Sequence, residues 1–429
     1  MDRQPLRTDF DAETVLLVGV QNGRASKWDV NDSLDELSQL SRTAGADVIG
    51  RFVCRQDKPV PSHYIGKGKA REISEWIEMN RPSFVVFDED LSPAQGRNLE
   101  EDIGVRVIDR TQMILDIFAQ HAHTKEGRLQ IELAQLEYLL PRLRRMWTHL
   151  ERQKGGIGLR GPGEMQLETD RRRIESRISR MKKELEQVRR HRKELRRGRR
   201  RHGWALTSLV GYTNAGKSTL LNSLTGSAVT SYNQLFSTLD PTTRQIELPN
   251  QQSVLLTDTV GFIRKLPHHL VESFKATLEE IVESDVLIHV IDASHPNVDR
   301  QIEAVNSVLE DIGVVDTPIL ALLNKIDTDE GAGQCSRLMS SIDRAVAVSA
   351  RTGEGLDEFL HELSDFLRDR NVRIEVRLPL SKGKMIAALH REGDVREEKY
   401  RSDHVFMVAY VPERMKSQFD DYKAAMDNG

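Results

Sequence analysis

Eight consecutive residues near the middle of the chain have the spacing of a phosphate-binding loop. Gly211 and Gly216 allow backbone angles that turn successive amide N–H groups towards one point, and the helix expected next directs its positive dipole end there. Lys217 adds a positive charge for the outer phosphates, and the Ser218 hydroxyl can ligate Mg²⁺. The pattern predicts that a nucleoside triphosphate is bound by Gly211, Tyr212, Thr213, Asn214, Ala215, Gly216, Lys217 and Ser218.

Two further segments are expected at the γ-phosphate. One ends an apolar run and consists of Asp258, Thr259, Val260 and Gly261; its carboxylate can hold Mg²⁺ through water, and its glycine amide can meet the γ-phosphate. The other lies between this segment and the loop and consists of Phe236, Ser237, Thr238, Leu239 and Asp240. Thr238 fits best as a second Mg²⁺ ligand that senses the γ-phosphate, and the nearby Thr242 and Thr243 stay as alternatives.

A polar segment after another apolar run indicates which base is bound. It consists of Asn324, Lys325, Ile326 and Asp327. Guanine presents N–H donors at N1 and N2, which the Asp327 carboxylate can accept together, while the Lys325 stem can cover the ring and Asn324 can brace the loop. The last expected strand is followed by Ser349, Ala350 and Arg351, where the Ala350 amide is expected to donate to guanine O6. These residues predict that the bound base is guanine.

Phe262 stands directly after Gly261, where many GTPases have a glutamine that orients the attacking water. A phenyl ring cannot form that hydrogen bond. We therefore expect slow hydrolysis by the chain alone and a partner that supplies or positions the missing group. No catalytic residue is assigned, because Arg244 and Arg264 are candidates only by proximity in sequence and solvated arginines are the simpler interpretation.

The elements around these motifs predict a doubly wound α/β domain at residues 203–370. Strands are expected at residues 206–210, 244–248, 253–257, 286–291, 319–323 and 345–348, with helices near 270–283, 298–312 and 356–367. In such a sheet, which is mostly parallel, the ligand lies at the carboxyl ends of the strands. The motifs above follow those ends.

Residues 12–125 alternate short apolar runs with helical patterns, which predicts a small α/β domain that contacts nucleotide or RNA. Strands are expected at residues 15–20, 48–54, 84–87 and 105–108, and helices at 33–44, 70–79 and 93–103. The segment from His63 to Lys69 has two glycines between lysines. It is either an anion-contacting loop, most plausibly for RNA, or a flexible solvated turn.

Residues 126–202 have two apolar stripes with heptad spacing, at 129–150 and 174–195, separated by the glycine-rich segment 155–163. They predict an antiparallel helical hairpin, with a kink at Pro141. The second stripe is also basic. Residues 171–202 hold sixteen Lys or Arg and four Glu, a net charge of +12, so the rest of the chain carries −16 to give the total of −4. Such crowding favours binding to a nucleic-acid backbone. Residues 372–429 predict a small α+β domain without visible chemistry.

Composition narrows the class of protein. With 38% hydrophobic and 30% charged residues and no long apolar segment, the chain of 429 residues is expected to be cytoplasmic, without a membrane span. Cys54 and Cys335 lie far apart and have no metal-binding spacing, which fits a reducing compartment.

The sequence resembles the HflX family, within the Obg–HflX group of P-loop GTPases. Besides the nucleotide motifs, the resemblance includes residues 64–69 (YIGKGK), 87–93 (FDEDLSP), 107–111 (VIDRT), 121–130 (HAHTKEGRLQ) and 161–172 (GPGEMQLETDRR), and it is only loose after Val372. It implies a GTPase that binds GTP and GDP through the residues named above, with Mg²⁺ held by Ser218 and Thr238. It also implies binding to the large ribosomal subunit and its RNA, dissociation of stalled or idle ribosomes, and stimulation of GTP hydrolysis by the ribosome. We expect the chain to be a monomer.

Two other functions stay open on the sequence. One is an ATP-dependent RNA-remodelling enzyme that uses the basic hairpin as a wedge, although Asp327 argues against adenine. The other is a nucleotide-gated scaffold that binds ribosomes without needing hydrolysis. We rank ribosome-coupled GTP hydrolysis first, because guanine selection, a one-sided cationic segment and a missing glutamine occur together.

Overall fold

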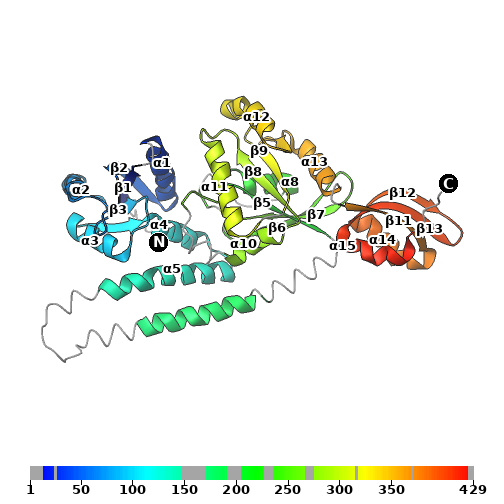
Figure 1. Cartoon of the computed structure of the whole chain (residues 1–429), viewed down its shortest axis with the longest axis horizontal. Coiled ribbons are helices and arrows are strands. Elements are labelled where there is room, and N and C mark those ends of the chain that lie inside the picture. The colour runs from blue at the N-terminus through cyan, green and yellow to red at the C-terminus, as the bar shows by residue number, and fades with distance from the viewer. Residues whose placement is uncertain are drawn as a thin grey trace, which may run out of the picture. The chain divides into compact units, whose positions relative to one another are not determined.

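The computed structural model (Figure 1) describes residues 13–23, 27–146, 171–188, 190, 204–226, 235–236, 238–265, 275–314, 317–368 and 371–423. The chain forms two compact units, which separate after Glu186 and are described in turn. The mixed α/β fold class is confirmed. The finer domain limits given above stay predictions.

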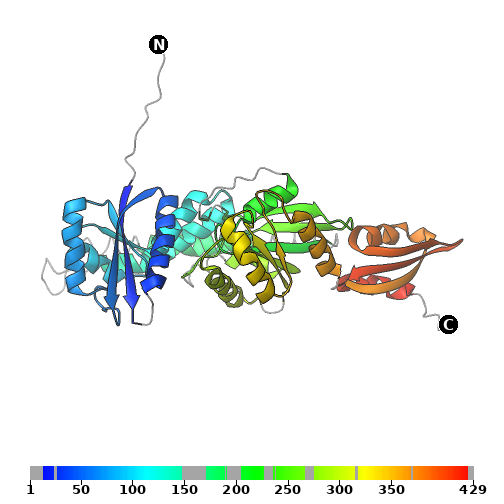
Figure 2. The same cartoon turned by 90° about the horizontal axis from the view of Figure 1, so that it is seen from above.

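The first unit contains a parallel four-stranded sheet with strand order β2-β1-β3-β4. Its strands are β1 (Glu13–Asn22), β2 (Ala46–Gln56), β3 (Phe84–Phe87) and β4 (Arg106–Asp109). Helices α1 (Lys27–Thr43), α2 (Lys67–Asn80) and α3 (Pro93–Ile103) cover it from both sides (Figure 2). A sheet with both faces covered needs strands that are apolar throughout, and every residue of β3 is buried.

Two features of this unit differ from the prediction. Helix α4 (Arg110–His121), which was not predicted, begins directly after β4, and Asp109 caps it by accepting a hydrogen bond from the Gln112 amide (2.9 Å). The segment from His63 to Lys69 is not a flexible, solvated turn, because Ile65 is fully buried and α2 already begins at Lys67. Its expected contact with an anion stays a prediction.

Helix α5 (Lys125–Met146) continues through Pro141 and lies antiparallel to a helix over residues 171–188 (Figure 1). Leu133, Ile178, Met181 and Leu185 pack between them, as the heptad stripes predict. Glu137 pairs with Lys182 across the two helices (2.8 Å). The glycine-rich segment 155–163 and most of the basic cluster at 189–202 lie outside the described residues.

The second unit contains a six-stranded sheet with strand order β10-β9-β8-β5-β7-β6, parallel except for β6. Its strands are β5 (Ala205–Val210), β6 (Thr242–Glu247), β7 (Ser253–Asp258), β8 (Val286–Asp292), β9 (Ile319–Asn324) and β10 (Ala345–Ala347). Strands β7 and β8, which follow each other in the chain, lie on opposite sides of β5, so the order reverses there. This reversal opens a crevice for a ligand at the carboxyl end of β5.

Among the described residues, the helices that connect these strands are α8 (Lys217–Thr225), α10 (Lys275–Val282), α11 (Val298–Asp311) and α12 (Asp329–Ser341), and α13 (Leu356–Arg368) follows β10. Helix α12 was not predicted. The hydroxyl of Thr328 caps its first turn by accepting a hydrogen bond from the Gly331 amide (3.1 Å). Residues 270–274 of another predicted helix lie outside the described residues.

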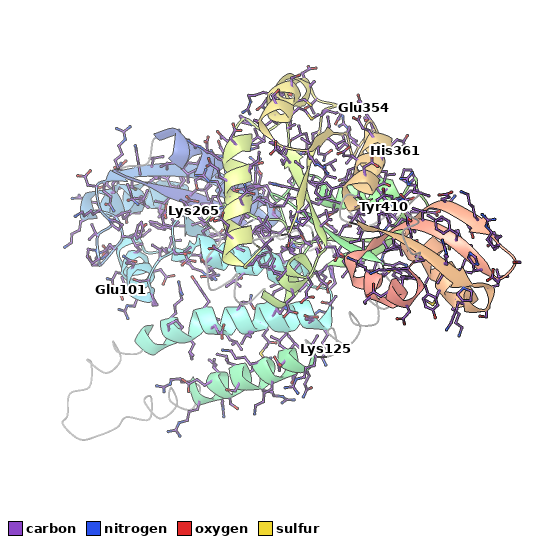
Figure 3. The ribbon with its side chains drawn as sticks, turned by 45° about the vertical axis from the view of Figure 1, so that its right-hand side comes forward. Glu101, Lys125, Lys265, Glu354, His361 and Tyr410 are labelled. Atoms are coloured by element: carbon purple, nitrogen blue, oxygen red, sulfur yellow. The ribbon has the colours of Figure 1, made fainter. Side chains whose placement is uncertain are left out.

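The last part of the chain is a three-stranded antiparallel sheet with order β11-β13-β12. Its elements are β11 (Asn371–Pro379), η1 (Leu380–Lys382), α14 (Gly383–Glu392), β12 (Asp394–Tyr400), β13 (His404–Pro412), α15 (Glu413–Lys416) and η2 (Ser417–Tyr422). One face of the sheet packs on Leu389, Met415 and Phe419. Tyr410, labelled in Figure 3, belongs to the central strand β13.

Candidate active site

The phosphate-binding loop joins β5 to α8, as its motif requires. Gly211 has φ 151°, and a Cβ there would lie 2.3 Å from the Val290 carbonyl oxygen. Gly216 has φ 98°, and a Cβ there would lie 2.2 Å from Asn324 Nδ2. Both glycines are therefore required by close packing as well as by backbone angle. Helix α8 starts at Lys217, so its first amides point into the loop.

The Lys217 side chain is buried within this loop. Its ammonium donates hydrogen bonds to the carbonyls of Gly211 (3.0 Å) and Tyr212 (2.9 Å). Burial lowers the pKa of Lys217 to about 8, and the nearby Asp258 carboxylate opposes that shift. An anion that approaches this lysine would stabilise its charged form.

Ser218, Thr238 and Asp258 form one cluster of oxygen atoms. Ser218 Oγ lies 2.7 Å from Thr238 Oγ1 and donates to Asp258 Oδ2 (2.6 Å), and Thr238 Oγ1 donates to the same oxygen (3.0 Å). Burial raises the pKa of the Asp258 carboxyl, while the hydrogen bond from Ser218 works in the opposite direction. Among the described residues, Asp258 Oδ1 is buried without a hydrogen-bond partner.

This oxygen set fits Mg²⁺. A hard, small cation prefers oxygen ligands and keeps several waters, so two hydroxyls and one nearby carboxylate suffice in a nucleotide site. In the part of the chain that the structure describes, no three His, Cys, Asp or Glu side chains form a metal-binding group. A metal here would therefore depend on the Ser218 and Thr238 hydroxyls.

The segment with Thr238 is attached to the loop on both sides of the phosphate site. The Phe236 amide donates to Thr213 Oγ1 (3.0 Å), and the Phe236 ring is 2% exposed. Leu239 is also buried. Ser237 lies outside the described residues, so its expected contact stays a prediction.

The main chain of Phe262 pairs with the phosphate-binding loop. Its amide donates to the Gly211 carbonyl (3.1 Å), and its carbonyl accepts from the Thr213 amide (2.7 Å). The Phe262 ring is 1% exposed. A Cβ on the preceding Gly261 would lie 2.7 Å from Thr213 Cα, so only glycine fits at this approach. The side chain at position 262 therefore belongs to the core and cannot face water.

The two guanine motifs are joined through Asn324. Its Nδ2 donates to the Ala215 carbonyl (2.8 Å), and its Oδ1 accepts from the Ala350 amide (2.9 Å). The expected bracing role of Asn324 thus has two visible contacts. The expected contact of the Ala350 amide with guanine O6 stays a prediction.

Asp327 has both carboxylate oxygens in contact with the loop that follows β10. Ser349 Oγ donates to Oδ1 (2.7 Å), and an Arg351 guanidinium nitrogen lies 2.5 Å from Oδ2. The Ser349 hydrogen bond and, less strongly, the Arg351 charge lower the pKa of Asp327. The carboxylate is therefore ionised at neutral pH, as acceptance of two N–H groups requires.

Sequence reasoning missed Asp292, at the end of β8. Its Oδ2 pairs with Lys325 Nζ (2.6 Å), and its Oδ1 accepts from the Ser294 amide (3.0 Å) and hydroxyl (2.6 Å). It thereby fixes the lysine whose stem we expect over the base. A carboxylate at the end of a buried strand beside the switch point was the available signal.

Many of the predicted phosphate residues line one hollow, and Arg244 and Arg264 are not among the residues that line it. Thr213, Asn214, Gly216, Lys217, Ser218, Phe236, Thr238, Thr259 and Gly261 line the hollow together with Thr219. Val260 and Ile326 belong to the predicted motifs but are not among the residues that line this hollow. Arg244 lies on β6 and bonds the Thr243 carbonyl (3.3 Å), and the Arg264 amide donates to the Tyr212 hydroxyl (2.9 Å).

Comparison with known proteins decides the family. The GTPase HflX of Lacrimispora saccharolytica is 46% identical over 409 residues, which cover 95% of this chain and 96% of that protein. The chain belongs to the HflX family of GTPases. The GTPase HflX of Escherichia coli K12 is 46% identical over 373 residues, covering 87% of this chain and 88% of that protein. As an HflX-family member, the chain is an enzyme that hydrolyses GTP.

Family models match the chain in three consecutive parts. Residues 31–119 match the GTP-binding GTPase N-terminal region, residues 121–199 the GTP-binding GTPase middle region, and residues 207–325 the 50S ribosome-binding GTPase. The chain is similar to a solved structure described as the crystal structure of the SsGBP and GDP complex, with 27% identity and a TM-score of 0.47. The match covers 82% of this chain and 98% of that one. Within the described residues, no helix has the length and apolar character that crossing a membrane requires.

Proposed function

We propose that this chain binds GTP with Mg²⁺ and couples its hydrolysis to the large ribosomal subunit. In this proposal Ser218 and Thr238 hold the metal, which, when bound, neutralises negative charge on the β- and γ-phosphates. Lys217 and the first amides of α8 bind the phosphates, and Gly261 approaches the γ-phosphate. Asp327 accepts the guanine N–H groups, with Asn324 bracing the loop and Lys325 covering the ring.

The burial of Phe262 is the observation that supports a requirement for a partner in hydrolysis. The phosphate site has positioning groups, but its main-chain geometry turns position 262 into the core, where it cannot orient water. A group from outside the described site must then complete the reaction. An added group that stabilises the transition state in trans speeds phosphoryl transfer by about 10³ to 10⁵ in other GTPases.

The large ribosomal subunit and its RNA are the proposed partner. Residues 207–325 match a family model described as a 50S ribosome-binding GTPase. The helix over residues 171–188 adds a strongly basic surface, with Arg171, Arg172, Arg173, Arg177, Arg180, Lys182 and Lys183. Lysine and arginine at this density gain free energy by releasing counterions from RNA phosphates. We further propose that the chain acts as a cytoplasmic monomer that separates stalled or idle ribosomes into subunits.

Gradient sedimentation tests the separation of ribosomes. Intact ribosomes incubated with the protein and a slowly hydrolysed GTP analogue should shift to the positions of separate subunits, and GDP should give less separation. Lys217→Ala should abolish the effect, because its phosphate site is weakened. Ribosomes that stay intact with an equimolar or larger amount of nucleotide-loaded protein would contradict this part of the proposal.

A further inference from the structure

The guanidinium of Arg351 lies on the carboxylate that is expected to recognise guanine. Its nitrogen is 2.5 Å from Asp327 Oδ2, and the Arg351 side chain is 76% exposed, whereas that of Asp327 is only 11% exposed. The Arg351 guanidinium thus covers the Asp327 carboxylate on its solvent-facing side. The other oxygen of Asp327 is held by Ser349.

The loop that bears Arg351 is fixed by its own hydrogen bonds. The Ser349 amide donates to the Glu354 carbonyl (2.9 Å), and the Gly353 amide donates to the Ser349 carbonyl (2.9 Å). The Thr352 amide also donates to Ser349 Oγ (3.1 Å). Glu354, labelled in Figure 3, lies in this loop just before α13. These bonds hold the main chain of the loop, and the Arg351 side chain is exposed, so Arg351 can leave Asp327 by side-chain rotation without breaking them.

Guanine and Arg351 require the same acceptor. Two N–H groups on one edge of guanine form a planar pair of donors, and so do two N–H groups of a guanidinium. Both groups satisfy a carboxylate in the same way, by donating in its plane to both oxygens. Each oxygen can accept two hydrogen bonds, and Ser349 and Arg351 already take one on Oδ1 and one on Oδ2. Guanine must therefore share Oδ2 with a bulky guanidinium or displace it.

We propose that Arg351 competes with guanine for Asp327 and thereby slows the entry of guanine nucleotides; this inference rests on the base-recognition role proposed for Asp327. In the nucleotide-free protein Arg351 neutralises the carboxylate and stabilises the loop. On binding, its solvent-exposed side chain rotates away, and the base takes its place. Arg351 is a positioning residue for nucleotide exchange and takes no part in hydrolysis.

Stopped-flow binding of a fluorescent GDP analogue to the nucleotide-free full-length protein tests this competition. Arg351→Ala should raise the association rate constant about two- to fivefold, the effect of removing one ion pair whose arginine is largely exposed. The dissociation rate constant should change less than about twofold, since Arg351 is away from Asp327 in the bound state. Salt should reduce the difference between wild type and variant, because it screens the pair that the wild type must break.

The control variant is Arg337→Ala, which removes another exposed ion pair, with Asp299 (3.0 Å), from the same unit. It should leave both rate constants unchanged. Arg351→Lys, which keeps the charge but loses the planar fork, should fall between wild type and alanine. Without nucleotide, Arg351→Ala should also lower the melting temperature, and saturating GDP should remove that difference.

The possible results separate this inference from the proposal on which it rests. An unchanged or slower association for Arg351→Ala overturns the inference, as does a faster dissociation with unchanged association, which would place Arg351 on the bound nucleotide. If Asp327→Asn does not weaken GDP binding or its preference over ADP, the base-recognition proposal itself is wrong. Loss of that preference in Asp327→Asn, together with no effect of Arg351→Ala, overturns the inference alone.

Discussion

The pKa of Lys217 depends strongly on the groups that surround its side chain. Burial holds its pKa at about 8 in the free protein, below the ordinary value of 10.5. Nucleotide phosphates would favour the charged form and raise the pKa again. Protonation of this lysine and binding of a nucleotide are therefore thermodynamically linked.

We predict that GDP binding takes up a proton between about pH 8 and 10.5, because the free protein has lost it there and the complex has regained it. Affinity should fall by at most about tenfold per pH unit above pH 8. Isothermal titration calorimetry at pH 9, in two buffers with different ionisation enthalpies, measures the uptake. Lys217→Arg, which stays charged, is the control and should show none. Equal enthalpies in the two buffers for wild type would contradict the link.

Phe262 gives a second prediction at this scale. Phe262→Gln should not restore a catalytic glutamine, because position 262 is buried and its main chain is fixed to the loop. The glutamine would place a polar amide in an apolar site, at a cost of roughly 3 kcal/mol of unfolding free energy. GTP turnover without a partner and urea unfolding measure the two effects, with Phe262→Leu as the apolar control. A large rise in turnover with unchanged stability would show that side chain 262 can reach water.

The residues of the site were largely predictable, since their chemistry depends on spacing along the chain. The pairing of Arg351 with Asp327 and of Lys325 with Asp292 was not, because each joins segments whose contact depends on how neighbouring strands are ordered. The binding of the Ala350 amide to Asn324 likewise depends on the position of a loop after folding.

Among the elements, Asp109 joins three parts of the first unit. Besides capping α4, it accepts from the Leu91 amide (3.2 Å), the Tyr138 hydroxyl (2.7 Å) and an Arg142 nitrogen (2.9 Å), the last two on α5. The Arg142 guanidinium also lies 3.3 Å from the centre of the Tyr138 ring. Desolvation raises the pKa of the Asp109 carboxyl, which its donors partly offset. This residue fixes the first helix of the hairpin to the sheet.

Asp109→Ala should therefore destabilise the first unit by roughly 3–5 kcal/mol, because it removes a buried acceptor and leaves Arg142 and Tyr138 without it. Hydrogen exchange followed by mass spectrometry should show faster exchange in both α4 and α5. Asp102→Ala, which removes a more exposed partner of His63 (3.2 Å), is the control and should cost at most about 1 kcal/mol. Faster exchange limited to α4 would mean that Asp109 is only a helix cap.

Elements with a strong apolar period were predictable, and β3 and α3 have the same limits in sequence and structure. Three elements were missed for identifiable reasons. Helix α4 follows a strand without turn residues, α12 begins among glycines, and β12 is an edge strand in which five of seven residues, Asp394, Arg396, Glu397, Glu398 and Lys399, are charged. In each, packing or a cap overrides a weak local preference.

At the scale of the whole molecule, positive charge is concentrated in one segment of the sequence. Residues 171–202 have a net charge of +12 in a chain whose total is −4. In the described helix, Arg177 pairs with Glu132 and Lys182 with Glu137, so α5 neutralises part of the cationic surface. The segment as a whole keeps its net positive charge, which would attract a polyanion.

Charge reversal on this helix should weaken binding to large ribosomal subunits. Lys183→Glu and Arg172→Glu together should reduce affinity and make the slope of log affinity against log salt less negative, because fewer counterions are released. Filter binding across salt concentrations measures the slope. Lys399→Glu, on β12, provides a charge reversal of the same kind in another part of the chain and should have a smaller effect. An unchanged slope would show that the hairpin does not meet RNA.

GTP turnover with and without purified large ribosomal subunits tests the account most directly. The site has groups to bind and hold GTP, but Phe262 is buried and cannot orient water, so the protein alone should turn over slowly. Saturating subunits should raise the turnover number at least tenfold, and added salt that releases the protein should remove the increase. A turnover number that subunits leave unchanged would contradict a GTPase completed by the ribosome.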